Sequence, residues 1–311
     1  YSFRNVAGTN HLSRHAYGEA LDINPRQNPY AMGATGDWSK YGIDPSALAK
    51  KYGLTYGGDW RKPDTMLETK NLTVRFGGHV AVNAVSCRFA PGTLTAIVGP
   101  NGAGKTTMLR VCAAQIHPSS GQARILDQRL GEVNVFELRT RIGFASSALA
   151  NQIPNSETVL NAVMTASYGV TGRWNESYDA IDERRAMRVL REWQLEDFAQ
   201  RPFGTLSDGE RKRVQIARSV MTDPELMLLD EPVASLDLAA RELTLRLLSG
   251  YATSAQAPAM AMVTHHLEEI PVGFTHALIL SQGQIFAAGE IHQTLTSDKI
   301  SEAFGFGLNV E

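Results

Sequence analysis

The stretch GPNGAGKTT at residues 99–107 decides the fold of this chain. It fits the pattern G-x-x-x-x-G-K-[ST], follows the apolar run TLTAIV and precedes the helical run MLRVCAAQ. Glycines let backbone N–H groups wrap around phosphate oxygens, and the dipole of the following helix favours an anion at its N-terminus. A strand, a glycine-rich loop and a helix in this order predict a nucleotide phosphate site in an α/β domain.

Two side chains of this loop are predicted to act on the phosphates directly. The ammonium of Lys105 would reach the β- and γ-phosphates, and the hydroxyl of Thr106 would ligate Mg²⁺. The pattern alone can occur by chance, but the strand before it and the helix after it favour a nucleotide site. The nucleotide-binding residues predicted here are Gly99, Pro100, Asn101, Gly102, Ala103, Gly104, Lys105, Thr106 and Thr107.

A second motif, LMLLDEP at residues 226–232, places two carboxylates directly after an apolar run. Such a run is typical of a buried parallel strand, and open α/β sheets bind ligands at the carboxyl ends of their strands. Asp230 is therefore predicted to hold Mg²⁺, directly or through water, and Glu231 to orient and deprotonate an attacking water. The alternative is a solvated turn, which the phosphate loop upstream disfavours.

A third motif, LSDGE at residues 206–210, is followed by the helical run RKRVQIARSVM. Ser207 and Gly209 would lie where the helix begins, with a hydroxyl and free N–H groups directed at an anion. Taken alone, LSDGE is an ordinary helix cap. Its place shortly before LMLLDEP favours a nucleotide-binding role instead.

In the order GPNGAGKTT, LSDGE, LMLLDEP, SLD (235–237) and VTH (263–265), the chain resembles the ATP-binding subunit of ABC transporters over residues 66–306. The resemblance implies an α/β fold of the P-loop NTPase class, with an antiparallel β subdomain and a helical subdomain. It implies ATP and Mg²⁺ as ligands, and ATP hydrolysis that powers solute transport through a separate membrane permease. It also implies a head-to-tail pair with a second ABC ATPase domain, in which Ser207 and Gly209 close on ATP held by the other copy.

Further single residues take roles from this resemblance. Phe76 matches the aromatic residue that stacks on adenine, with a core Phe on a strand as the alternative. Asp237 matches the loop that links the two sites of a pair, and His265 matches the histidine that contacts the γ-phosphate. The implied catalytic residues are Lys105, Glu231 and His265.

The phrase IGFASS at residues 142–147 departs from the family pattern. Family members carry Gln in a phrase like IGxxxQ, and here Ser147 occupies that position. A serine hydroxyl can still serve Mg²⁺ as a ligand, but it is shorter than the Gln side chain and has no amide. Gln152 is the alternative if the loop bends differently.

Residues 155–200 are expected to form the helical subdomain. Met187, Leu190 and Leu195 recur near helical spacing in the run DERRAMRVLREWQLEDF. The segment resembles the part of transporter ATPases that contacts their membrane subunits. An amphipathic helical pair packed on the core is the alternative.

Composition excludes several other classes of protein. The 311 residues are 43% hydrophobic and 20% charged, which is typical of a globular protein, and the formal net charge is −2. This charge gives no electrostatic reason to expect a nucleic-acid partner. The apolar runs are far shorter than the ~20 residues of a membrane span. Together with the resemblance, this predicts a cytoplasmic protein bound peripherally to the inner face of the cell membrane.

A different pattern, S-x-H-x-x-G-x-A-x-D, occupies residues 13–22 and is followed by NPY and YGGDW. It resembles the zinc D-alanyl-D-alanine carboxypeptidase and L-alanyl-D-glutamate endopeptidase family, which cuts peptidoglycan peptides and has an α+β fold. The resemblance implies zinc ligands at His15 and Asp22 and a general base at Asp64. The third ligand of that family is a His that would fall at Leu67, so the zinc site is incomplete.

The two patterns meet without a linker. The peptidase-like phrase matches up to Met66, and the ATPase-like phrase NLTVRFGG begins a few residues later. Residues 1–63 contain only nine Leu, Ile, Val, Phe or Met residues, too few for a packed core of their own. The sequence predicts an incomplete zinc-peptidase-like fragment at 1–66 and an ABC ATPase domain at 67–311, joined by gene fusion or assembly error.

Two other functions stay open on the sequence alone. The first is a bifunctional chain with residual zinc peptidase activity on peptidoglycan peptides, which needs a third metal ligand from elsewhere. The second is an ABC ATPase that acts on a cytosolic partner and transports nothing. The absence of Gln at position 147 keeps this second function open.

Overall fold

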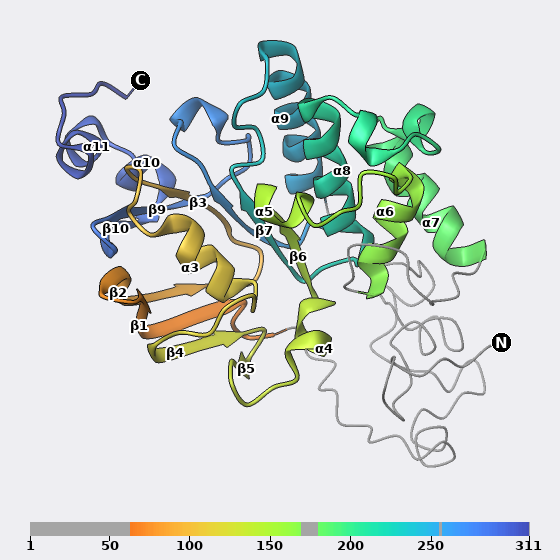
Figure 1. The fold of residues 1–311 in the computed structure, drawn as a ribbon. Helices are drawn as coiled ribbons and strands as arrows, with labels where there is room; N and C mark the ends of the chain where they lie inside the picture. The colour runs from red at the N-terminus through yellow and green to blue at the C-terminus, as the bar shows by residue number, and fades with distance from the viewer. Residues whose placement is uncertain (1–62, 169–179, 255–256, 311) are drawn as a thin grey trace, which may run out of the picture. The chain divides into compact units, whose positions relative to one another are not determined.

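The computed structural model of the chain describes residues 63–168, 180–254 and 257–310. Lys62–Glu311 forms one compact unit, drawn as a ribbon in Figure 1. The proposed zinc ligands His15 and Asp22 lie outside the described residues. Among the residues described, no helix has the length and apolar character that crossing a membrane requires.

A twisted antiparallel sheet forms the first layer of this unit. Its strand order is β2-β1-β4-β5, with β1 (Leu67–Phe76), β2 (His79–Phe89), β4 (Ser120–Ile125) and β5 (Gln128–Arg129). β1 pairs with β2 on one side and with β4 on the other, and both pairings are antiparallel. This sheet is the antiparallel β subdomain that the family resemblance implies.

A second sheet forms the centre of the unit. Its strand order is β10-β9-β3-β8-β7-β6. The strands are β3 (Leu94–Val98), β6 (Ile142–Ala145), β7 (Leu226–Asp230), β8 (Ala259–Val263), β9 (His276–Ser281) and β10 (Gln284–Glu290). All pairings from β9 to β6 are parallel, and only β10 runs antiparallel to its neighbour. The expected α/β class is confirmed.

Helices cover both faces of the central sheet. Helix α3 (Lys105–Cys112) lies between this sheet and the antiparallel sheet and packs against strands of both (Figure 1). The other helices are α4 (Val135–Arg139), α5 (Ser147–Ala150), α6 (Val159–Met164), α7 (Ala180–Glu192), α8 (Asp208–Met221), α9 (Leu238–Ala252), α10 (Ile291–Thr294) and α11 (Ser297–Phe304). Short 3₁₀ helices occupy η2 (Thr165–Tyr168), η3 (Glu196–Phe198), η4 (Phe203–Thr205) and η5 (Leu267–Glu269).

Strand β7 shows why an uninterrupted apolar run becomes a central strand. Successive side chains of a strand point to opposite faces of the sheet. Leu226 and Leu228 pack into the core that contains α3, whereas Met227 and Leu229 pack into the core that contains α6 to α9. Both faces of β7 are therefore shielded from water, and the sequence of such a parallel strand is a continuous hydrophobic run.

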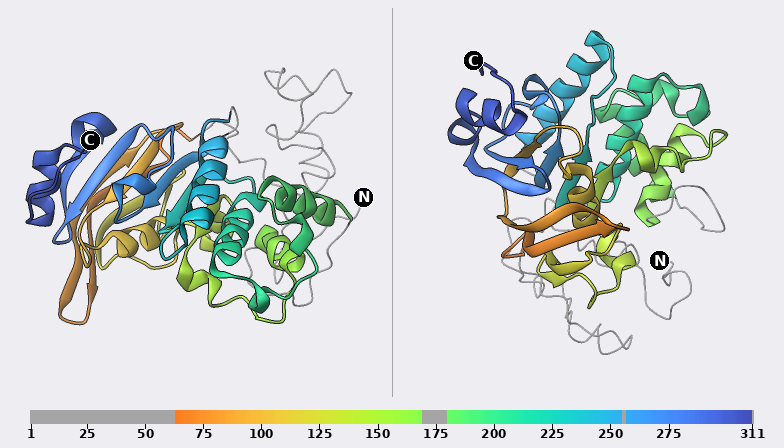
Figure 2. Two further views of the ribbon diagram at one scale, coloured as in Figure 1. Left: turned by 90° about the horizontal axis from the view of Figure 1, so that it is seen from above. Right: turned by 60° about the vertical axis from the view of Figure 1, so that its left-hand side comes forward.

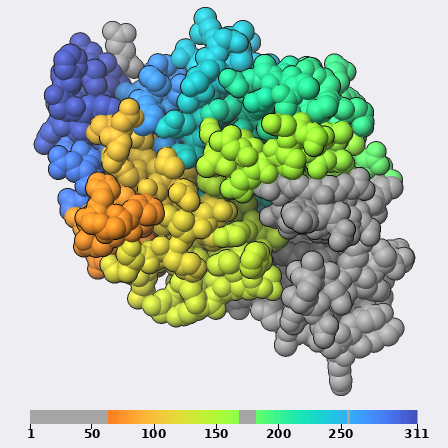
Figure 3. Space-filling view, in the orientation of Figure 1, coloured from red at the N-terminus to blue at the C-terminus, as the bar shows by residue number. Residues whose placement is uncertain are grey.

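The helical segment α6 to α8 lies at the end of the unit opposite to α10 and α11, as the two views of Figure 2 show. In the space-filling view of Figure 3, its surface (green) and that of the antiparallel sheet (orange and yellow) occupy different sides of the face. Leu190 and Leu195 are buried in its core. Met187 and Leu190 lie on helix α7, whereas Leu195 follows its end, because Gln194 adopts a left-handed conformation (φ 54°) that ends the helical run.

The junction predicted from the sequence begins the antiparallel sheet. The backbone N–H of Asp64 donates to Oδ2 of Asp127 (2.7 Å), and the N–H of Met66 donates to the carbonyl of Phe89 (3.0 Å). Leu67 is fully buried, opposite Phe89 on β2 and Ile125 on β4. The residue that stands in place of a zinc-binding His is thus a core residue of the sheet.

Candidate functional site

The glycine-rich loop connects β3 to α3, as the sequence predicts. Helix α3 begins at Lys105 after Gly104, which has φ 93° and makes no side-chain cap hydrogen bond. No acidic residue lies in the first turn of the helix. Its N-terminal N–H groups therefore face the loop without a competing carboxylate, an arrangement that suits a phosphate.

Two glycines of the loop have no room for a side chain. A Cβ on Gly99 would lie 2.0 Å from the carbonyl oxygen of Leu280 on β9, and a Cβ on Gly104 would lie 2.2 Å from that of Ala81 on β2. Backbone atoms of both sheets thus press against the loop from two sides. This close packing holds the loop in one shape, ready for a ligand.

We expect Gly104→Ala to destabilise the chain by about 2–4 kcal/mol, because it combines a left-handed φ with a backbone clash. The loop should also lose the phosphate binding that the sequence predicts for it. Gly250→Ala is the matched control, since Gly250 lies exposed on helix α9 with open space around it. That change should stabilise the helix by about 0.5–1 kcal/mol. Thermal unfolding of both variants measures whether the free energy of unfolding falls in Gly104→Ala and rises in Gly250→Ala. Equal changes in the two variants would contradict the steric argument.

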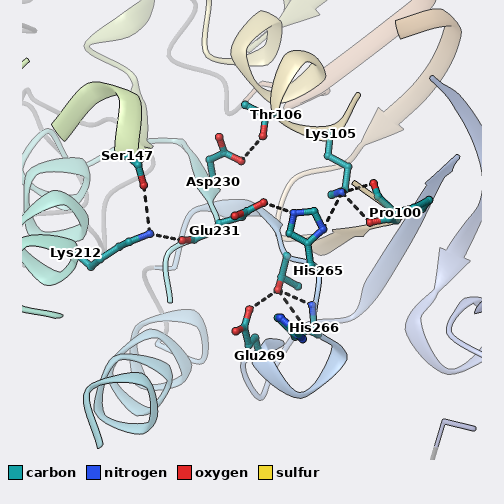
Figure 4. A network of polar contacts seen from close by, with 12 residues as sticks. Pro100, Lys105, Thr106, Ser147, Lys212, Asp230, Glu231, His265, His266 and Glu269 are labelled. Atoms are coloured by element: carbon teal, nitrogen blue, oxygen red, sulfur yellow. Dashed lines mark hydrogen bonds and ion pairs between the residues drawn. The ribbon is translucent and has the colours of Figure 1, made fainter. Parts of the chain in front are cut away.

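The buried ammonium of Lys105 turns back onto its own loop. Its Nζ donates to the carbonyls of Gly99 (2.7 Å) and Pro100 (2.9 Å) and lies 3.2 Å from Nδ1 of His265 (Figure 4). Burial lowers the pKa of Lys105 to about 8, against the opposing charges of Glu231 and Asp230. Two neutral carbonyls are weaker partners than phosphate oxygens, so this ammonium is available to an anion.

The carboxylates after β7 face the loop from the adjacent part of the sheet. The hydroxyl of Thr106 donates to Oδ1 of Asp230 (2.9 Å), and burial raises the pKa of Asp230, partly offset by this hydrogen bond. A hydroxyl and a carboxylate at this distance are the hard oxygen donors that Mg²⁺ prefers. The pair therefore fits a magnesium ion that also binds phosphate.

Glu231 pairs with His265 across the site. Its Oε1 contacts Nε2 of His265, and both side chains remain partly exposed. The backbone of Glu231 is left-handed (φ 49°), and its N–H donates to the carbonyl of Val263 on β8 (3.0 Å). This turn directs the carboxylate toward the histidine (Figure 4).

A buried carboxylate anchors the loop that carries His265. The hydroxyl of Thr264 donates to Oε2 of Glu269 (2.5 Å) and accepts from the N–H of His266 (3.1 Å). Glu269 belongs to η5, which begins after His266 as its N-cap. His266 thus caps this short 3₁₀ helix and does not join the group around Lys105.

Ser147 lies at the start of α5, exposed, and its hydroxyl accepts a hydrogen bond from Nζ of Lys212 (3.4 Å). The same ammonium donates to the backbone carbonyl of Glu231 (2.7 Å), and burial lowers the pKa of Lys212. The sequence analysis does not predict Lys212, although it lies five residues after Ser207, the N-cap of the same helix. Gln152 lies exposed beyond the end of α5.

The remaining predicted residues lie apart from this network. Ser207 is the N-cap of α8 and forms a capping box with Glu210, whose N–H donates to the Ser207 hydroxyl (3.3 Å). Asp237 caps α9 by accepting from the N–H of Ala240 (2.8 Å). Phe76 is 51% exposed at the end of β1, which excludes the alternative of a core residue.

The described residues show no cluster of side chains of the kind that binds zinc. Across residues 63–168, 180–254 and 257–310, no group of three or more His, Cys, Asp or Glu side chains is arranged to hold a metal ion. The backbone N–H of Asp64 donates to the side chain of Asp127, in the turn between β4 and β5. Nothing in the described residues supports a zinc site.

Comparison with known proteins agrees with both halves of the sequence pattern. The ABC transporter family matches residues 82–234, and the D-alanyl-D-alanine carboxypeptidase family matches residues 7–66. The second match ends at the residue before Leu67.

Individual proteins extend the first match. The ABC transporter ATP-binding protein YlmA of Bacillus subtilis (strain 168) is 33% identical over 246 residues, which cover 79% of this chain and 93% of that protein. The manganese transport system ATP-binding protein MntB of Listeria monocytogenes is 29% identical over 239 residues, or 77% of this chain and 96% of that protein. Among solved structures, MJ1267, an ATP-binding cassette of an ABC transporter, gives a TM-score of 0.66 at 25% identity, covering 77% and 98% of the two chains. The chain has this similarity together with the glycine-rich loop, the carboxylates at the end of β7 and the helix α8 that follows LSDGE. It therefore belongs to the ABC transporter ATP-binding proteins.

Proposed function

We propose that this chain hydrolyses ATP and that its turnover powers transport through a separate membrane permease. One observation carries the proposal: the carboxylate of Glu231 faces His265, directly beside Lys105 and the Thr106–Asp230 pair. A phosphate cradle, a metal-binding pair and a positioned base are the parts that phosphoryl transfer to water requires. The family to which the chain belongs supports the same reaction.

Positively charged and N–H groups of the site bind the phosphates, and oxygen donors bind the metal ion. Lys105 exchanges the carbonyls of Gly99 and Pro100 for β- and γ-phosphate oxygens, and the N–H groups at the start of α3 bind the same phosphates. Thr106 and Asp230 would hold Mg²⁺, and Ser147 would be a further oxygen ligand. Mg²⁺, when bound, neutralises charge on the phosphates. These contacts place the γ-phosphate close to Glu231.

The reacting water is handled by the Glu231–His265 pair. Glu231 orients the water and takes its proton as general base. His265 then donates from its ring to the γ-phosphate oxygens, and the buried Thr264–Glu269 contact holds its loop in place. Exposed Phe76 stacks on adenine.

A second copy of the domain completes the site. Ser207 and Gly209 present a hydroxyl and N–H groups at the start of α8, and Asp237 lies at the start of the neighbouring α9. In a head-to-tail pair, these residues close on ATP that is held by the other copy. We assign the pair to the cytoplasmic face of the membrane, with the segment α6 to α8 toward the permease. MntB, named for manganese transport, supports a metal ion as cargo.

For the chain as a whole, we propose an ATPase domain at 67–311 preceded by an incomplete peptidase-like fragment at 1–66. The peptidase family match ends at Met66, and the position of its third ligand is the buried Leu67. A residual peptidase would need a third ligand from another position, because Leu67 cannot bind a metal. The fragment is therefore proposed to be inactive.

We expect the purified chain to hydrolyse ATP in the presence of Mg²⁺ and to stop when EDTA removes the metal. Lys105→Ala removes the buried cation and should weaken ATP binding by about ten- to a hundredfold. Phosphate release and binding of a fluorescent ATP analogue measure the two effects. Lys70→Ala, an exposed lysine on β1, is the control. Equal turnover in wild type and Lys105→Ala would overturn the proposal, and co-purification with a permease decides between transport and a cytosolic role.

A further inference from the structure

Ser147 stands where family members carry Gln, and a second residue supplies the donor group that the serine lacks. A Gln side chain carries an acceptor oxygen and an N–H₂ donor on one group, whereas serine offers one short hydroxyl. In this chain the hydroxyl of Ser147 accepts from Nζ of Lys212 at 3.4 Å. Lys212 is a residue of helix α8, so the donor comes from a different element than the acceptor.

The same ammonium holds the turn that carries the catalytic carboxylate. Nζ of Lys212 donates to the backbone carbonyl of Glu231 at 2.7 Å, the shorter of its two contacts. The N–H of Glu231 donates to Val263 on β8 at 3.0 Å. The peptide groups on both sides of this residue are thus tied to different elements of the fold.

This double attachment has a physical reason. Glu231 has a left-handed backbone (φ 49°), which costs a non-glycine residue about 1–2 kcal/mol and persists only where the surroundings enforce it. In this conformation its carboxylate faces His265 (Figure 4). A donor on the carbonyl side is therefore a restraint on the direction of the carboxylate.

Charge favours this place for Lys212 as well. The carboxylates of Asp208, Asp230, Glu231 and Glu269 all act on its ammonium. The side chain is half-buried and directed into the site, so it is not an ordinary solvated surface lysine. An ammonium among these carboxylates lowers their mutual repulsion around the turn.

We infer that Lys212 is a positioning residue for Glu231. Lys212 and Ser147 together replace the Gln side chain that family members carry at position 147, and Lys212 connects helix α8 to the turn at Glu231. The inference rests on the proposed ATPase function. Ser207 starts the helix that carries Lys212, so any displacement at the start of α8 is passed to the Glu231 carbonyl through one side chain. Binding of a second copy at Ser207 is thereby linked to the orientation of the Glu231 carboxylate.

The test replaces Lys212 by Met, which keeps the length of the side chain and removes its donors. We expect Lys212→Met to lower kcat for ATP about tenfold while KM changes less than about twofold, because the ground-state contacts to ATP remain. Lys212→Arg keeps charge and donors and should recover most of the rate. Ser147→Ala should lower kcat less than Lys212→Met. The loss in the double variant should be smaller than the product of the two single losses, because the two residues are in contact.

Hydrogen exchange provides a readout that needs no turnover. In Lys212→Met, amides in the segment 231–236 should exchange at least about threefold faster, with the rest of the chain unchanged. Lys299→Met is the matched control, since the Lys299 ammonium also donates to a backbone carbonyl, that of Gln293 (2.6 Å), outside the site. It should change neither kcat nor exchange in this segment.

The outcomes separate this inference from the proposed function. Wild-type turnover that is lost in Lys105→Ala, together with a normal Lys212→Met enzyme, overturns only the role of Lys212. If the wild type does not hydrolyse ATP, unchanged exchange in 231–236 still rejects the restraint, and faster exchange supports it. A fall in melting temperature with faster exchange throughout the chain would make Lys212 a general stability residue and would also overturn the inference.

Discussion

Glu231→Gln is expected to lower kcat for ATP hydrolysis by about a thousandfold while ATP still binds. The amide of Gln has the size of the carboxylate but cannot take a proton from water. The phosphate contacts come from Lys105 and the start of α3, which this change leaves in place. The variant should therefore bind ATP without cleaving it, and head-to-tail dimers should accumulate. Phosphate release and size-exclusion chromatography with ATP measure the two effects.

The control for this variant lies in the same region of the chain. Glu268 is an exposed carboxylate whose Oε1 lies 3.7 Å from Nδ1 of His266. Glu268→Gln removes a Glu–His contact of similar type outside the catalytic group, and its kcat should equal that of the wild type. A Glu231→Gln enzyme that turned over at the wild-type rate would show that another group accepts the proton.

Leu67→His is expected to destabilise the chain by about 3 kcal/mol and to bind no zinc. The side chain is fully buried between Phe89 and Ile125, so an imidazole there loses apolar contacts and hydrogen-bonding partners together. In a domain of this size the melting temperature should fall by roughly 6–12 °C. The substitution restores the His of the peptidase pattern in sequence, but at a core position of the ATPase.

Lys70→His is the matched control, since Lys70 lies on the same strand with its side chain largely exposed. It should leave stability within about 0.5 kcal/mol of the wild type. Thermal unfolding and zinc content after dialysis are the two measurements. A stable Leu67→His protein with one zinc per chain, lost again on His15→Ala, would show that the N-terminal segment keeps a usable metal site.

Much of the fold follows from local patterns. The apolar runs TLTAIV and LMLLD predict β3 and β7, because a strand buried on both faces must be apolar at successive positions. Ser207 predicts the start of α8, because its side chain satisfies a free N–H of the first turn. Helix α7 is predicted less well: the spacing of Leu195 suggests helix, but the left-handed Gln194 ends it.

The candidate site also has parts that local sequence predicts and parts that depend on packing between distant residues. The sequence determined by itself the loop 99–107, the carboxylates at the end of β7 and the start of α8, because each depends on neighbours a few residues away. Only the tertiary structure decided that Lys212 contacts Ser147, 65 residues distant, and the carbonyl of Glu231. It also decided that Leu67 is a core residue, because strand pairing with β2 and β4 sets its burial. Such contacts depend on how helices and strands pack, and no local pattern of residues encodes that packing.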